Sequence, residues 1–209
     1  MVAEQVARIL LDVKAVRLRP DEPFTWSSGW KSPIYCDNRV TLSYPEVRTV
    51  IKNALVDAIR RHFPAAGAIA GVATAGIAQG ALVADVLNLP YVYVRPEPKK
   101  HGMGNQIEGR LEAGQQVVLI EDLISTGGSS LKVVDALRQA GAQVMGMAAI
   151  FTYGFPIADQ NFAKKGVELV CLSNYETLIN EAQQLNYIPA EAAASLAAWR
   201  QNPAEWNKA

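Results

Sequence analysis

The sequence predicts an α/β protein: a parallel sheet flanked by helices, with a small N-terminal hood. Two apolar segments, residues 68–73 and 117–120, each pass through a turn of small residues directly into a helical pattern. Further apolar strand segments follow at residues 91–94, 144–151 and 167–172. Strands that alternate with helices in this way are typical of parallel sheets covered on both faces.

The length of the chain favours a single domain. Its 209 residues, half of them hydrophobic, are enough for one substantial core and too few for two ordinary independent domains. We expect one domain over residues 1–209, with the hood mainly from 1–40, the core at about 45–175 and packing helices at 175–209.

Composition excludes several classes of partner. Net charge is zero, with 20 basic and 20 acidic residues, so nothing indicates a nucleic-acid or acidic membrane surface. The N-terminal segment carries Glu4, Arg8 and Asp12 at helical intervals and is no signal sequence, and no apolar run reaches membrane-spanning length. Cys36 and Cys171 lie far apart and suit free thiols in a reducing compartment. We therefore expect a cytoplasmic protein without nucleic-acid or membrane partners.

The first part of the chain predicts a helix and then an irregular segment. Val6, Ile9, Leu10 and Val13 share one helical face, which predicts an amphipathic helix to about Val16. Residues 23–39 mix turn residues with Trp26, Trp30 and Tyr35. This segment is either a hood over a site or an edge hairpin whose aromatic side chains pack in the core.

A second helix is predicted from Pro45, because Pro suits the first helical turn and the apolar face continues to Ile59 before Pro64. The strand at residues 68–73 then leads into Thr74, Ala75 and Gly76 and a helical run at 77–86. This turn either binds an anionic group through its backbone N–H groups or is a plain strand–helix connection. Turns at the carboxyl ends of parallel strands face one crevice, where open α/β sheets bind ligands.

A basic loop follows the strand at residues 91–94. Residues 95–106 contain Arg95, Lys99, Lys100 and His101 with two prolines and two glycines, so they cannot form a stable helix or a central strand. Such a loop is either a solvated surface or a mobile lid. Its place immediately before the acidic segment favours a lid that carries cations onto a polyphosphate.

Residues 117–130 carry the main site signal. The strand at 117–120 runs into Glu121 and Asp122, then into the small residues 125–130, and then into a helix at 131–140 that Gly141 caps. Backbone N–H groups and hydroxyls in such a turn, with the helix N-terminus, suit a phosphate. Carboxylates suit the vicinal hydroxyls of a ribose or a divalent cation. The pattern therefore predicts a ribose that carries phosphate, and neither a Walker A loop nor a three-glycine dinucleotide fingerprint fits it.

This segment resembles the phosphoribosyl-diphosphate (PRPP) motif of type I phosphoribosyltransferases: an apolar strand, two acids and a Thr/Ser-Gly-rich loop. Over most of its length the chain resembles the orotate phosphoribosyltransferase family. The further matches are Phe24-Thr25, Ser28-Gly29, Ser32-Pro33-Ile34-Tyr35, Asp37 and Arg39 in the hood, the turn at 71–76, and Arg95 with residues 99–102. The resemblance implies the type I fold, a homodimer, and Mg²⁺-dependent conversion of orotate and PRPP to orotidine 5′-monophosphate and pyrophosphate in pyrimidine nucleotide synthesis.

The resemblance also implies roles for residues at matching positions. Glu121 and Asp122 would bind the ribose hydroxyls, residues 125–129 the 5′-phosphate and residues 74–76 the diphosphate, and the basic loop would close over the diphosphate, in part in the partner's site. The implied PRPP-binding set is Arg95, Lys99, Lys100, His101, Thr74, Ala75, Gly76, Glu121, Asp122, Leu123, Ile124, Ser125, Thr126, Gly127, Gly128 and Ser129. The implied catalytic residues are Lys99, His101 and Arg95, and the implied orotate contacts are Ser125, Ile34, Tyr35 and Tyr153.

The expected chemistry needs no covalent intermediate, because orotate brings its own nucleophilic nitrogen and no Ser–His pair is evident. Mg²⁺ would arrive with the diphosphate and keep several waters, so no protein metal ligand is expected. Two alternatives stay open: a phosphoribosyltransferase for another base, and a PRPP-binding regulator without catalysis.

Overall fold

The computed structural model describes residues 1–26, 29–95, 97 and 106–206. Within them a central sheet of six strands has the order β10-β9-β8-β5-β6-β7. All neighbours are parallel except β6 and β7, which are antiparallel. The strands are β5 (Ala68–Val72), β6 (Tyr91–Val94), β7 (Ile107–Glu108), β8 (Gln116–Ile124), β9 (Gln143–Thr152) and β10 (Leu169–Asn174). The predicted α/β fold with a mostly parallel sheet is confirmed.

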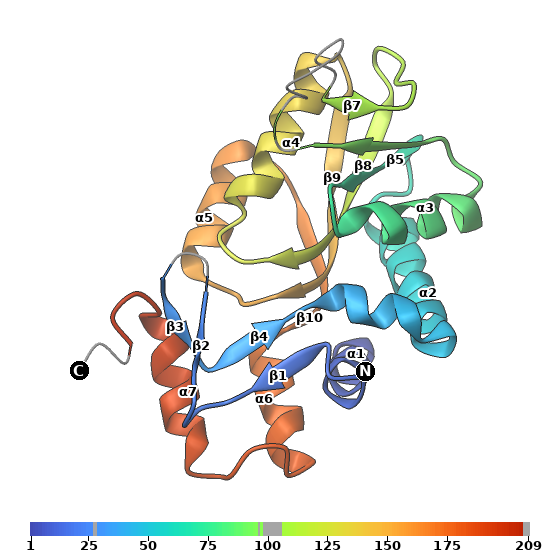
Figure 1. Cartoon of the computed structure of the whole chain (residues 1–209). Helices are drawn as coiled ribbons and strands as arrows, with labels where there is room; N and C mark the ends of the chain where they lie inside the picture. The colour runs from blue at the N-terminus through green and yellow to red at the C-terminus, as the bar shows by residue number, and fades with distance from the viewer. Residues whose placement is uncertain (27–28, 96, 98–105, 207–209) are drawn as a thin grey trace.

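Alternating side chains divide the core between the two faces of the sheet. Val118 and Ile120 of β8 pack on one face, and Val117 and Leu119 pack on the other. The first face is covered by α1 (Val2–Asp12), α2 (Pro45–His62) and α3 (Gly76–Leu87), and the second by α4 (Gly128–Gln139) and α5 (Pro156–Lys165) (Figure 1). None of the described helices combines the length and apolar character needed to cross a bilayer.

The sheet has a switch point between β5 and β8. The chain leaves β5 to form β6 on one side and later returns to form β8 on the other. The last β5–β8 pair is Gly71 with Ile120, whereas β8 continues along β9 to Ile124. Open α/β sheets bind ligands in the crevice at such a point, outside the carboxyl ends of the strands.

The N-terminal hood consists of short paired strands. Strand β1 (Val16–Leu18) pairs with β4 (Ile34–Cys36), β2 (Phe24–Thr25) pairs with β3 (Lys31–Ser32), and the 3₁₀ helix η1 (Asn38–Ser43) follows. Figure 1 shows these strands below the sheet, beside the C-terminal helices. The hairpin interpretation of the segment holds in part, because β2 and β3 form an antiparallel pair and Trp26 packs on Tyr153, with ring centroids 5.2 Å apart. Whether the segment covers a site stays a prediction.

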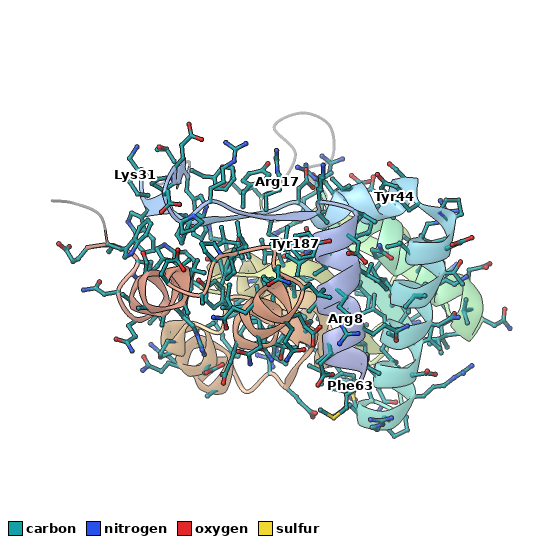
Figure 2. The ribbon with its side chains drawn as sticks, turned by 90° about the horizontal axis from the view of Figure 1, so that it is seen from below. Arg8, Arg17, Lys31, Tyr44, Phe63 and Tyr187 are labelled. Carbon is teal, nitrogen blue, oxygen red and sulfur yellow. The ribbon has the colours of Figure 1, made fainter. Side chains whose placement is uncertain are left out.

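The C-terminal helices α6 (Tyr175–Gln184) and α7 (Ala192–Gln201) complete the core beneath the hood. Trp199 is fully buried, and its Nε1 donates to the carbonyl of Lys31 at 3.2 Å. Helix α1 is tied to this end by the Arg8–Glu181 ion pair and by a 2.6 Å hydrogen bond from Tyr187 to Asp12 (Figure 2 labels Arg8 and Tyr187). The predicted packing helices are thus present.

Several boundaries differ from the prediction. The first helix ends at Asp12, not near Val16, because Lys14 adopts a left-handed φ of 57° and the chain then enters β1. Strand β8 continues through Glu121 and Asp122 to Ile124, so the two acids lie inside a strand and not in the turn after it. Strand β10 begins and ends two residues later than the predicted segment.

Helix α5 and strand β7 were not predicted. Helix α5 carries clear end signals, with Pro156 in its first turn and Gly166 in a left-handed conformation after its last. Strand β7 is only two residues long, too short for any periodicity to show.

We expect Trp199→Ala to lower the free energy of unfolding by about 3–5 kcal/mol, because it empties a buried aromatic site. Leu185→Ala is the control, since Leu185 is 42% exposed, and it should cost no more than about 0.5 kcal/mol. Urea unfolding of both variants measures the difference. Equal effects would show that Trp199 does not hold the hood on the C-terminal helices.

Candidate active site

Two adjacent carboxylates lie at the switch point. The Glu121 side chain is buried, and its Oε1 accepts a hydrogen bond from Ser130 Oγ at 2.8 Å. Burial raises the pKa of Glu121 to about 8, and the charge of Asp122 adds to the rise. Burial also raises the pKa of Asp122 to about 6, although hydrogen bonding to its own backbone N–H and the charge of Arg39 oppose this. Such a pair gains from a ligand that brings hydroxyl donors or a cation.

The loop after β8 presents the N-terminus of α4. Gly127 has a φ of 78°, and a Cβ there would lie 2.6 Å from the Phe162 ring, so glycine is required on both counts. Asn161 Nδ2 holds the loop by donating to the carbonyl of Thr126 at 2.9 Å. Thr126, Gly128 and Ser129 are exposed. Exposed hydroxyls and a helix N-terminus are the arrangement that binds phosphate.

The turn after β5 packs directly against the acidic strand. A Cβ at Gly76, the first residue of α3, would lie 2.4 Å from the Ile120 carbonyl oxygen and 3.3 Å from Glu121 Oε2. The preceding Ala73–Thr74 peptide bond is cis. The expectation that residues 74–76 and the acidic segment share one crevice therefore agrees with the structure.

Arg95 lies at the base of the basic segment. Its Nε is 3.3 Å from Glu108 Oε1 on β7, and its guanidinium carbon is 6.0 Å from the centre of the Tyr93 ring. Its backbone N–H donates to the Gln106 carbonyl at 2.9 Å. Lys99, Lys100 and His101 lie outside the described residues, so the lid remains a prediction.

A cleft of about 670 Å³ lies between the hood and the end of β8. Its size and aromatic walls suit a planar ring. It brings together three of the four predicted orotate contacts, Ser125, Tyr35 and Tyr153. The remaining lining residues are Thr25, Trp26, Trp30, Cys36, Leu123 and Thr126.

Two predicted site residues have no exposed side chain. Ile34 is fully buried, and its carbonyl accepts hydrogen bonds from Trp26 Nε1 at 3.2 Å and from Ser32 Oγ at 2.8 Å. Ile124 is also fully buried, with its carbonyl accepting from the Tyr153 N–H at 3.1 Å. Both residues therefore support the site from the protein interior, Ile34 beneath the hood wall of the cleft and Ile124 at the end of the acidic strand.

Sequence reasoning missed several residues that shape the site. Trp26 was placed only in an undecided segment, yet it lines the cleft. Asn38 Nδ2 donates to the carbonyl of Asp122 at 2.6 Å, and Ser130 binds Glu121. The polar Asp37-Asn38-Arg39 cluster was the available signal for Asn38. Ser130 was part of the predicted small-residue turn, but nothing local marks it as the partner of Glu121, since Ser is common at the start of a helix.

The residues fit a divalent cation that arrives with its ligand. Among the described residues, no group of three His, Cys, Asp or Glu side chains could hold a metal alone. Glu121 and Asp122 still supply two neighbouring carboxylates on one strand. Mg²⁺ commonly uses one or two carboxylates together with substrate phosphates and water.

We expect Glu121→Gln to change the pH dependence of stability. An unfolded glutamate loses its proton near pH 4.5, whereas the ligand-free fold keeps it up to about pH 8. The fold therefore binds more protons than the unfolded chain in this window, and stability falls as pH rises, by up to about 1.4 kcal/mol per pH unit.

The variant lacks this loss, so its stability relative to the wild type should be greater at pH 8 than at pH 4.5. Urea unfolding at both pH values measures this, with the exposed Glu112→Gln as control. A relative stability that does not change with pH would show that Glu121 titrates normally.

Comparisons with known proteins agree with this geometry. Residues 41–177 match the family model described as phosphoribosyl transferase domain. The orotate phosphoribosyltransferase of Cytophaga hutchinsonii is 58% identical over 205 residues, which cover 98% of each chain. That of Porphyromonas gingivalis is 56% identical over 201 residues, 96% of each chain.

A crystal structure of orotate phosphoribosyltransferase from Aeropyrum pernix superposes with a TM-score of 0.76 at 32% identity, covering 88% of this chain and 99% of that one. The alignment with the Cytophaga hutchinsonii relative covers 98% of this chain and so includes the hood as well as the sheet. The chain therefore belongs to the phosphoribosyltransferase family, in its orotate phosphoribosyltransferase branch.

Proposed function

We propose that this protein transfers the ribose 5-phosphate group of PRPP to orotate, giving orotidine 5′-monophosphate and pyrophosphate in de novo pyrimidine synthesis. One observation carries the proposal: the buried Glu121 and the half-buried Asp122, an open helix N-terminus and an aromatic cleft adjoin at one switch point. The full-length relatives named orotate phosphoribosyltransferase support the choice of reaction.

PRPP lies along the crevice in this proposal. The carboxylates of Glu121 and Asp122 accept hydrogen bonds from the ribose hydroxyls. Residues 125–129 surround the 5′-phosphate at the N-terminus of α4, and residues 74–76 hold the diphosphate through backbone N–H groups. Leu123 and Ile124 connect the acidic pair to the phosphate loop and keep β8 in register with β9.

Orotate lies in the neighbouring cleft. Tyr35, Tyr153 and Trp26 contribute aromatic walls, and Ser125 offers a hydroxyl where the cleft meets the phosphate loop. Ile34 supports the wall through the hydrogen bonds that its carbonyl accepts. Leu123 and Ser125 line the cleft from the end of the acidic strand and its loop, so the base and the sugar would meet at this point.

In the reaction an orotate ring nitrogen forms a bond to the ribose C1′ while the bond from C1′ to the diphosphate oxygen breaks. The diphosphate leaves with the electron pair of that bond, and the sugar passes through a cation-like state. The proton of the reacting orotate N–H passes to an oxygen of the departing diphosphate or to water. The protein holds the two reactants in line and meets the developing negative charge with Arg95, Lys99 and His101. Mg²⁺ that arrives with PRPP would further neutralise the diphosphate. Closure of the basic loop would exclude water that could hydrolyse PRPP.

We further propose a homodimer in which the basic loop reaches the partner's site, and a cytoplasmic location. Cys36 and Cys171 are free thiols, which suits a reducing compartment. Arg95 anchors the loop at the sheet edge formed by β6 and β7.

The direct test follows the ultraviolet absorbance of orotate with purified protein, PRPP and Mg²⁺, and runs adenine, guanine and uracil in parallel. We expect the absorbance to fall in the orotate sample and in none of the samples with the other bases. A chelator should abolish this fall. Reaction of another base in place of orotate would move the protein to a different branch of the family. PRPP binding without any transfer would identify a regulator.

We expect Asp122→Asn to lower kcat/KM for PRPP about ten- to a hundredfold, because a charged acceptor for a ribose hydroxyl is lost. Asp135→Asn is the matched control, since Asp135 pairs with Lys165 on the surface of α4 and α5. Steady-state kinetics and thermal unfolding distinguish lost binding from lost folding. Unchanged PRPP kinetics would remove Asp122 from the site.

Lys99→Ala should lower kcat by about 10²–10³, the usual effect of removing one preorganised charge donor. If the loop crosses the dimer, mixing Lys99→Ala with Asp122→Asn should recover activity, up to about a quarter of wild type for random subunit exchange. Activity of the mixture is measured against each variant alone. No recovery after proven exchange would place loop and site in the same chain.

A further inference from the structure

A buried polar side chain connects the hood with the acidic strand. Asn38 is 1% exposed, and its Nδ2 donates to the Asp122 carbonyl at 2.6 Å. Its Oδ1 accepts from Cys36 Sγ at 3.4 Å, and Cys36 lines the aromatic cleft. One amide therefore touches the backbone of a proposed ribose-binding residue and the wall of the proposed orotate cleft.

The connection extends to the helix that follows the diphosphate turn. Thr41 Oγ1 donates to the Asn38 carbonyl at 2.6 Å, and Gln79 Nε2 of α3 lies 3.5 Å from Thr41 Oγ1. Both side chains are buried, and Gln79 Oε1 has no hydrogen-bond partner among the described residues. A buried polar chain with an unsatisfied end adds little stability, so stability alone does not explain it.

The position of Asn38 explains why a side chain is needed there. Strand β5 makes its last pair with β8 at Ile120, so Asp122 has no partner on that neighbouring strand. The Asn38 amide supplies the hydrogen bond that an adjacent strand would give. The carboxylate of Asp122 is held in place by its backbone, and that backbone is held on this side by the hood.

We propose that Asn38 is a positioning residue, which fixes the backbone of Asp122 so that its carboxylate meets the ribose of PRPP. The inference rests on the proposed function. It differs from a purely structural role, in which Asn38 would only keep the hood folded. Loss of the hood would weaken orotate as much as PRPP, because the hood contributes Trp26 and Tyr35 to the cleft.

The test uses Asn38→Leu, which keeps the approximate volume and removes the donor, and Asn38→Ser, which carries the test if the leucine variant does not fold. Ser32→Ala is the matched control. Ser32 is fully buried in the hood, and the hydrogen bond that its hydroxyl donates ends on Ile34, not on β8. The Kd of PRPP with Mg²⁺ is measured by calorimetry, and the KM values of PRPP and orotate by steady-state kinetics.

We expect Kd and KM for PRPP to rise about tenfold in the Asn38 variants, the effect of losing a hydrogen bond to a buried carbonyl. The KM for orotate should change by less than about twofold, and Ser32→Ala should leave PRPP binding unchanged. Equal weakening of both substrates, or the same change in Ser32→Ala, would overturn the proposal. A wild-type protein that neither binds PRPP nor transfers it would instead overturn the proposed function.

Discussion

The site depends on the burial of two carboxylates in strand β8, which extends beyond the end of the neighbouring strand β5. Strand β8 continues to Ile124 along β9, whereas its last pair with β5 is at Ile120. Glu121 and Asp122 therefore lie inside regular structure, just beyond the last residue that β8 pairs with β5. Desolvation raises the pKa of both groups, so the ligand-free site holds charge only at a cost. A ligand with hydroxyl donors, or a divalent cation, favours the charged carboxylates. Binding should therefore lower the pKa values of both groups.

The surrounding elements follow from this arrangement. The turn at Gly76 must approach the Ile120 carbonyl closely, which leaves no room for a side chain there. Gly127 starts α4 in a left-handed conformation against Phe162, so the helix N-terminus opens next to the acidic strand. Asn38 then closes the free edge of β8 from the hood. Sheet, loops and hood thus converge on one short stretch of strand.

Much of this could be predicted from local patterns, and the remainder depends on distant contacts. Apolar runs and small-residue turns identified five of the six strands of the central sheet and the two loops, because buried parallel strands leave a clear signal. The pattern could not place Glu121 inside a strand, since paired acids ordinarily end one. Trp199 reaches a hood carbonyl 168 residues away, and Asn38 reaches β8 across 84 residues. No local period encodes such contacts.

The proposed PRPP-binding residues and part of the proposed base-binding cleft come from different parts of the chain. The family model matches residues 41–177, which contain the acidic pair and both phosphate loops. Trp26, Trp30 and Tyr35, which line the aromatic cleft, all precede this range. In the proposed function, the matched domain would therefore hold PRPP, while the hood would contribute aromatic side chains to the selection of the base. Because the Cytophaga hutchinsonii relative aligns over 98% of this chain, its similarity includes the hood and favours the same base.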